Sequence, residues 1–197
     1  MMKARLFSAF FIFFLLGGFY SSAQNRVERQ HRIKKSQFPS EALKTVAQNN
    51  KDIKRLKFYR EVDTAQKRYI AKFKKARLFY EMGFDQKGEF KNMSFKVKQV
   101  DVPEDSFQRI TAYLSQHFEK SKIRKMWQLY PIKGHGSPEK TIKKAFQNLM
   151  VPSMFYNLLV RGKKDGKTAD YKVFFDAGGN FKEMRKSLPA NYDRVLY

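Results

Sequence analysis

The 197-residue sequence contains no cysteine. This absence excludes disulfide bonds, thiol chemistry and attachment of a lipid to a cysteine side chain. Small exported domains without a sufficient hydrophobic core are usually rich in disulfides. The 20 phenylalanines and 10 tyrosines provide material for such a core instead. An exported chain of this kind is more typical of a bacterium than of an animal.

Residues for catalysis or metal binding are also scarce. The three histidines, His31, His117 and His135, are far apart in the sequence and show no metal-ligand spacing. His135 precedes Ser137, but no carboxylate lies near them in sequence to orient a nucleophilic pair. A phosphate-binding glycine loop is absent as well. The sequence therefore predicts no catalytic residue, no metal, no cofactor and no enzyme.

Long apolar runs are missing except at the start of the chain. Lys3 and Arg5 precede 15 apolar or small residues, from Leu6 to Tyr20, and small residues follow up to Ala23. This order is typical of a secretory signal peptide, and the run is shorter than the roughly 20 residues of a membrane-spanning helix. We expect cleavage after Ala23, with an uncleaved anchor as the alternative. The predicted location is the periplasm, or alternatively the extracellular medium, with no membrane span in the mature chain.

Acidic residues are few, since 18 of them face 41 lysines and arginines, for a net charge of +23. Loss of Lys3 and Arg5 with the signal peptide lowers the charge to +21. Such a charge attracts polyanions. Export makes nucleic acid an unlikely partner, so we expect lipopolysaccharide phosphates, anionic lipids or acidic glycans. The alternative is a solvated surface without a dedicated partner.

A short motif occurs twice. Residues 84–93 (FDQKGEFKNM) and 175–184 (FDAGGNFKEM) are identical at six of ten positions. The aspartate and glycine of each copy are typical of a turn between two strands, which also accounts for Asp85 and Asp176 without catalysis. Upstream, Pro39 and Pro103 each begin a predicted helix. The sequence therefore predicts a duplication.

The apolar pattern after each proline changes from a helical period to a period of two. Phe107, Ile110, Leu114 and Phe118 form one helical stripe, and Leu43 and Val46 a shorter one. Four alternating segments follow each helix, apolar on one face and basic on the other. They lie near residues 55–62, 68–74, 78–84 and 93–97, then 123–130, 155–163, 169–176 and 180–188. The predicted fold class is α+β, with two tandem repeats of a helix plus a four-stranded antiparallel sheet.

The second copy is 27 residues longer than the first between the proline and the turn aspartate. The extra residues, about 131–156, include a helix with Ser137 as N-cap, Pro138 in its first turn and an apolar face containing Ile142, Phe146 and Leu149. This helix is interpreted as a cover on the sheet, with a functional lid as the alternative. The predicted domains are a signal peptide (1–23), a linker (24–37), a first repeat (38–100) and a second repeat (101–197) with this insertion.

A proline-led helix followed by antiparallel strands and an FD-x-x-G-x-F turn, repeated behind a signal peptide, resembles the PepSY-like family related to the β-lactamase-inhibitor fold. The resemblance covers about residues 38–188. It implies a small, exported, non-catalytic domain that binds, and is able to inhibit or modulate, a protein of the cell envelope. The basic excess and the insertion depart from the usual pattern, and no contact residue of the inhibitor can be transferred.

The basic strand face is the candidate binding surface, because cations interleaved with aromatic rings can hold anions and stack on planar or sugar faces. Its predicted residues are Arg55, Lys57, Tyr59, Arg68, Lys72, Lys74, Phe79, Trp127 and Tyr130. Trp127 shares its parity with Ile123 and Leu129, so a place in the core is the alternative for this residue. Two partners remain open: an envelope protein, or an anionic glycan or lipid.

Overall fold

The computed structural model describes residues 29–49, 51–62 and 67–187. The predicted signal peptide, residues 1–23, lies outside the described residues. No helix within them is long and apolar enough to cross a membrane.

The described chain consists mainly of antiparallel strands. Their bounds are β1 Arg29–Ile33, β2 Ile53–Val62, β3 Lys67–Lys75, β4 Leu78–Phe84, β5 Phe90–Val97, β6 Lys120–Pro131, β7 Phe155–Lys164, β8 Lys167–Asp176 and β9 Phe181–Ser187. Three α-helices, α2 (Ser40–Gln48), α3 (Glu104–His117) and α4 (Pro138–Phe146), interrupt the series of strands. Two 3-10 turns, η1 (Lys35–Gln37) and η2 (Gln99–Asp101), precede α2 and α3.

All nine strands belong to one sheet, in the order of the sequence from β1 to β9. The predicted fold class, two tandem repeats of a helix plus a four-stranded antiparallel sheet, is therefore wrong. β5 and β6 pair directly, from Asn92↔Pro131 to Val97↔Met126, across the boundary expected between the repeats. The segment expected to be a linker also contributes a strand, since β1 pairs with β2. Alternation within a strand shows which side chains share a face, but it does not show where a sheet ends.

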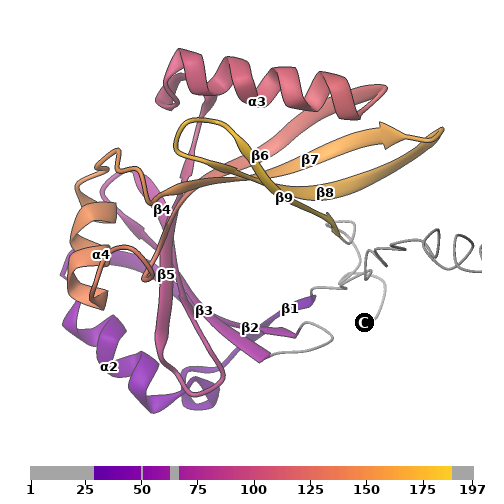
Figure 1. Ribbon diagram of the computed structural model, residues 1–197. Helices are drawn as coiled ribbons and strands as arrows, with labels where there is room; N and C mark the ends of the chain where they lie inside the picture. Colours follow the sequence, from indigo (N-terminus) through magenta and orange to yellow (C-terminus); the bar gives the residue numbers. More distant parts are fainter. Residues whose placement is uncertain (1–28, 50, 63–66, 188–197) are drawn as a thin grey trace, which may run out of the picture.

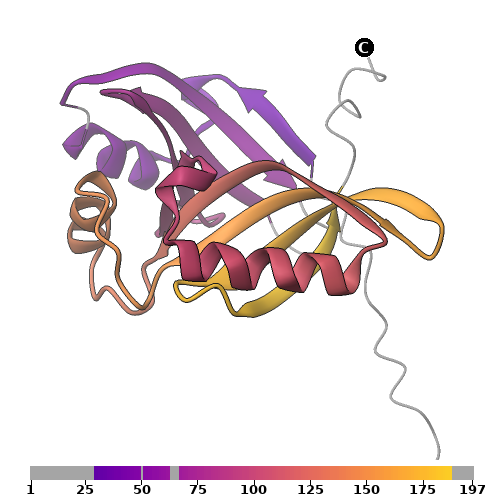
Figure 2. The same cartoon turned by 90° about the horizontal axis from the view of Figure 1, so that it is seen from above.

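One face of the sheet holds the core. A row of directly paired residues that crosses five strands is buried throughout, and it consists of Phe58, Ala71, Met82, Met93 and Tyr130. The sheet is strongly curved, and this apolar face is its convex side (Figure 1). All three helices lie on that outer side (Figures 1 and 2). The side chains at the alternate positions of each strand therefore face the concave side.

The helices begin where the sequence predicts. Pro39 is the N-cap of α2, and Glu41 lies in the first turn of that helix. Pro103 is the N-cap of α3, and Glu104 and Asp105 lie in its first turn. Acidic groups there are favourable beside the positive end of the helix dipole.

The helix of the insertion is also present. Ser137 accepts a hydrogen bond from the Lys140 amide as the N-cap of α4, and Ile142 is fully buried. The rings of Phe146 and Tyr80 pack edge to face, with their centroids 5.2 Å apart. In the structure α4 thus covers the convex face, as the preferred interpretation stated, although Leu149 lies beyond the helix and is 42% exposed.

The two copies of the motif form equivalent turns. Asp85 Oδ1 accepts from the amides of Lys87 and Glu89, and Asp176 Oδ1 accepts from those of Gly178 and Asn180. The carboxylates thus serve the turns, as expected. A tight turn also joins β7 to β8, with Asp165 and Gly166 at positive φ.

Candidate functional site: a basic hollow on the concave face

Seven of the nine predicted site residues lie together in one hollow of about 330 Å³ on the concave face. They are Arg55, Lys57, Tyr59, Lys72, Lys74, Phe79 and Trp127. Lys96 and Lys125, which sequence reasoning did not single out, complete its set of cations. We refer to this site as the basic hollow.

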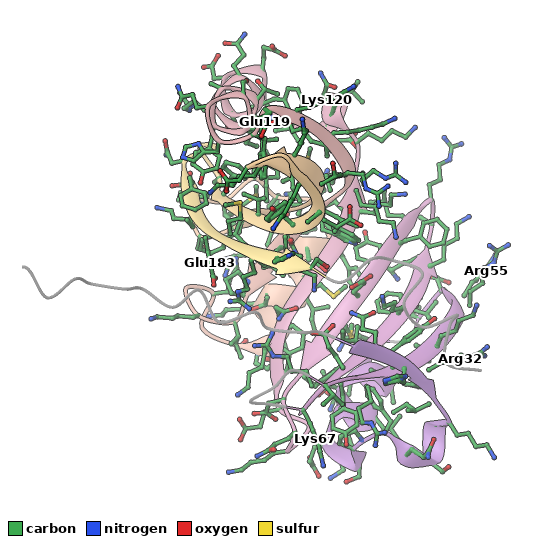
Figure 3. The ribbon with its side chains drawn as sticks, turned by 90° about the vertical axis from the view of Figure 1, so that its right-hand side faces the viewer. Arg32, Arg55, Lys67, Glu119, Lys120 and Glu183 are labelled. Carbon is green, nitrogen blue, oxygen red and sulfur yellow. The ribbon has the colours of Figure 1, made fainter. Side chains whose placement is uncertain are left out.

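Strand geometry brings these side chains together. A bulge in β2 between Lys54 and Lys57 places Arg55 at a φ of 57°. The same bulge disrupts the predicted apolar stripe of β2, since Leu56 is 36% exposed although Phe58 is buried. On the neighbouring strands, Lys57 lies opposite Lys72, and Lys96 lies opposite Trp127. Arg55 projects from β2 in the view into the open side of the sheet (Figure 3).

The charge of the basic hollow is strongly unbalanced. Six cations line it, against one acid, Glu81. Glu81 pairs with Lys72 at 3.1 Å, and Lys72 also donates to Gln30 at 2.9 Å. Within the described ranges, none of the other five cations forms an ion pair. Such a concentration of one sign of charge attracts an anion into the hollow.

Like charges directly opposite each other on neighbouring strands destabilise a sheet. The ladder between β2 and β3 contains two such pairs, Lys54↔Lys74 and Lys57↔Lys72. A bound anion would relieve this repulsion.

Aromatic rings form the walls of the basic hollow. The ammonium of Lys72 lies 4.9 Å from the ring centroid of Tyr59, and that of Lys74 lies 5.7 Å from that of Phe79. Phe79 is 51% exposed. Trp127 is half-buried and lines the hollow, so the alternative that placed it in the core is not what the structure shows.

The remaining two predicted residues lie elsewhere. Tyr130 is fully buried on the convex side and donates to the Leu149 carbonyl, so its assignment to the binding face is corrected. Trp127 and Tyr130 are three positions apart, and residues an odd number apart in a strand point to opposite faces. Burial raises the pKa of the Tyr130 hydroxyl above its usual value. Arg68 lines a second, neighbouring hollow.

This second hollow, of about 420 Å³, contains both signs of charge and shares Glu81 with the first. We call it the mixed hollow. Its basic residues are Arg68, Lys91, Lys172 and Arg185, and its acidic residues are Glu61, Glu81 and Asp85. Burial, together with the charge of Arg185, lowers the pKa of Lys172 to about 8. The buried Oδ1 of Asn157 has no hydrogen-bond donor within the described part of the chain.

The His135 loop does not form the nucleophilic pair considered from the sequence. The Ser137 hydroxyl caps α4, while His135 is 4% exposed and its Nε2 lies 3.3 Å from Ser153 Oγ. A ring this deeply covered does not meet a substrate. Across residues 29–49, 51–62 and 67–187, no group of three potential ligands is placed to hold a metal ion.

Comparison by sequence finds no matching family model and no similar curated protein. Comparison by structure finds a DUF2874 family protein from Bacteroides uniformis, with a TM-score of 0.51 at 10% identity, covering 75% of this chain and 88% of that one. A putative periplasmic protein from Bacteroides eggerthii has a TM-score of 0.51 at 12% identity, covering 76% and 88%. These two proteins share the fold.

A BLIP-like protein from Bacteroides fragilis also aligns, at 13% identity over 75% of this chain and 86% of its own. Its TM-score of 0.47 is too low to carry an argument about function. The PepSY-like assignment stays a prediction.

Proposed function

We propose that this protein is an exported, non-catalytic binding module of the bacterial periplasm that holds an anionic ligand on the concave face of its sheet. The observation that carries the proposal is the basic hollow, where five cations without an ion pair in the described residues lie beside the aromatic rings of Tyr59, Phe79 and Trp127. Hydrogen bonds and ion pairs from lysine and arginine to phosphate or carboxylate are among the strongest polar contacts available to a protein.

Phosphorylated or acidic envelope glycans and lipids fit this chemistry best. The two hollows have volumes of about 330 and 420 Å³, within the range of about 300–1,000 Å³ that is usual for small-molecule sites. Aromatic faces next to cations suit sugars that bear anionic groups. A ligand hydroxyl in the mixed hollow could donate to Asn157 Oδ1, which has no donor among residues 29–49, 51–62 and 67–187.

An acidic surface of an envelope protein is the second candidate, and the protein would then act as a modulator or inhibitor. Aromatic residues are enriched in protein interfaces, and the exposed Phe79 and the half-buried Trp127 provide them here. Export itself rests on the predicted signal peptide, and the description of a structural neighbour as a putative periplasmic protein supports it.

The test compares the mature protein with two charge-reversed variants in binding to purified lipopolysaccharide. Lys57→Glu with Lys74→Glu reverses two cations of the basic hollow. Lys140→Glu with Lys143→Glu makes the same change in net charge on the exposed side of α4. We expect the first variant to lose at least tenfold in affinity and the second to bind nearly as the parent does.

Equal losses in both variants would mean that binding depends on net charge alone, and the proposal would fail. Two results together would favour the second candidate. The protein would bind an envelope protein even in high salt, and both variants would bind lipopolysaccharide equally. Exposed charges are screened beyond about 8 Å at physiological ionic strength, so salt weakens the purely ionic mode most.

A further inference from the structure

Neutral polar side chains from two strands line the mixed hollow. Asn92 and Ser94 lie on either side of Met93 in β5, and Asn157 lies on β7. Met93 is buried in the core, and so are the two chain neighbours of Asn157. Successive side chains of a strand point to opposite faces, so all three polar side chains face the concave side.

None of these three polar side chains has a hydrogen-bond partner in the described part of the chain. Ser94 is 7% exposed, and the Oδ1 atom of Asn157 is buried. Buried polar groups without a partner cost free energy, and most are therefore paired in folded proteins. The end torsion of an asparagine side chain is broad, so a small rotation turns Oδ1 toward a group in the hollow.

The charges of the mixed hollow are nearly balanced. Four basic and three acidic residues line it, compared with six and one in the basic hollow. Lys91 pairs with Asp85 at 2.9 Å, and Glu81 is already paired with a lysine of the basic hollow. Arg185 donates to both carboxylate oxygens of Glu183, at 2.5 and 2.8 Å. An anion therefore gains less in the mixed hollow than in the basic hollow.

The polar side chains without partners select a ligand by its hydrogen bonds. The amide of Asn157 needs a donor for Oδ1 and an acceptor for Nδ2. A hydroxyl group both donates and accepts, whereas an ionised carboxylate only accepts. Ile70, Leu129 and Phe174 add apolar area to the same hollow, and this area suits the C–H faces of a sugar ring.

We propose that the mixed hollow binds an uncharged sugar residue, as a site separate from the anion site of the basic hollow. The inference goes beyond the proposed function, because a neutral sugar needs none of the cations of the basic hollow. The balanced charges decide against an anion, and the acceptor without a donor decides for a ligand that bears hydroxyl groups. The volume of about 420 Å³ lies within the usual range for small-molecule sites.

Calorimetry with neutral methyl glycosides tests the site in the mature protein. The panel consists of the methyl glycosides of glucose, galactose, mannose and N-acetylglucosamine, with glycerol as a control that has hydroxyl groups but no ring. We expect at least one glycoside to bind at least tenfold more tightly than glycerol. Its affinity should be the same at low and at 1 M salt, because salt screens only interactions between charges.

Two variants test the polar side chains of the mixed hollow. Asn157→Leu replaces the amide by an apolar side chain of similar size, and we expect it to lose at least tenfold in affinity for the glycoside. Its stability should be unchanged or higher, because the buried acceptor without a donor is removed, whereas a structural role would lower it. Ser94→Ala should weaken binding by a smaller factor. Gln147→Leu, the same kind of change on the exposed end of α4, is the control and should bind as the parent does.

The possible results distinguish the two proposals. Lys57→Glu with Lys74→Glu should bind the glycoside as the parent does, although it loses lipopolysaccharide. If no glycoside binds more tightly than glycerol, the sugar inference is wrong, and lipopolysaccharide binding still tests the anion site by itself. If Asn157→Leu binds the glycoside as tightly as the parent, the sugar lies elsewhere and the inference is also wrong.

Discussion

At the scale of single residues, Lys57 shows how stability and binding are opposed in the basic hollow. It lies directly opposite Lys72, and no ion pair of the described residues includes it. We expect Lys57→Gln to raise the free energy of unfolding by a few tenths of a kcal/mol at low salt, because a cross-strand repulsion is removed. The same change should weaken binding of the anionic ligand.

Urea unfolding at low and at 1 M salt checks this prediction. The stabilisation should disappear at 1 M salt, where the Debye length falls to about 3 Å. Lys140→Gln is the control, since this exposed lysine of α4 has no lysine opposite it in a ladder. A loss of stability in Lys57→Gln at low salt would show that the lysine supports the fold instead.

We expect His135 to make the free energy of unfolding depend on pH. Its burial, and secondarily the charge of Lys144, lowers the pKa of its imidazole below 6.5. Below pH 6.5 the unfolded chain therefore takes up a proton that the folded chain resists. The contribution of the neutral His135 ring to the free energy of unfolding is fully present above about pH 6.5. It is lost as the pH falls through the lowered folded-state pKa.

Unfolding measured between pH 5 and pH 8 tests this assignment. We expect His135→Gln to flatten the decrease in stability on the acidic side, whatever its effect at pH 8. An unchanged slope in the variant would assign the pH dependence to other groups.

At the scale of elements, the turn between β8 and β9 is held against α3. Ser106 Oγ donates to the Ala177 carbonyl, and Arg109 Nε donates to that of Gly178. A Cβ on Gly179 would lie 2.2 Å from the Ser106 carbonyl oxygen. Gly179 also has a φ of 81°.

Gly179→Ala is therefore expected to destabilise the protein in two ways, through backbone strain of about 1–2 kcal/mol and through a clash with helix backbone. Gly166→Ala is the matched control, because its φ is 72° but nothing lies within 4 Å of the added Cβ. Thermal unfolding should show the larger loss for Gly179→Ala. Equal losses would mean that the turn moves away from α3 without cost.

The period of the apolar pattern predicted the individual elements well. Strand alternation located eight of the nine strands, and the helical stripes and prolines located α2, α3 and α4. The short strand β1 (RQHRI) was missed because its sequence has little apolar alternation, and its place depends on pairing with β2. The bulge at Arg55 was also not predictable, because no glycine marks it.

The same alternation predicted most of the candidate site. Residues of one parity on β2, β3 and β4 gather in the basic hollow because neighbouring strands hold them side by side. Lys96 and Lys125 were missed because their place beside the hollow depends on the pairing of β5 with β6. Tyr130 was misplaced because it lies three positions from Trp127 on β6, and residues an odd number apart in a strand point to opposite faces.

At the scale of the whole molecule, the continuous sheet predicts that the two halves do not fold alone. Phe95 and Tyr130, on adjacent strands from different halves, stack at 6.1 Å, and α4 from the second half places Phe146 against Phe73 and Tyr80 of the first. We expect a fragment of residues 24–100 to lack stable structure by circular dichroism. The mature protein should unfold in one cooperative transition.

A folded 24–100 fragment would contradict the single-sheet account. The matching fragment 101–197 serves as the second measurement, since it would leave β6 without β5 and α4 without the rings it covers. Both fragments should instead recover structure when mixed, if their strands can pair.

Trp127 gives the most direct test of the central claim, that the concave basic face binds an anionic ligand. It is the only tryptophan of the chain and it lines the basic hollow, so its fluorescence reports on that site alone. We predict a saturable change in its emission on titration with lipopolysaccharide, weakened at least tenfold by Lys57→Glu with Lys74→Glu and kept by Lys140→Glu with Lys143→Glu. Binding seen by calorimetry without any change in Trp127 emission would contradict the account.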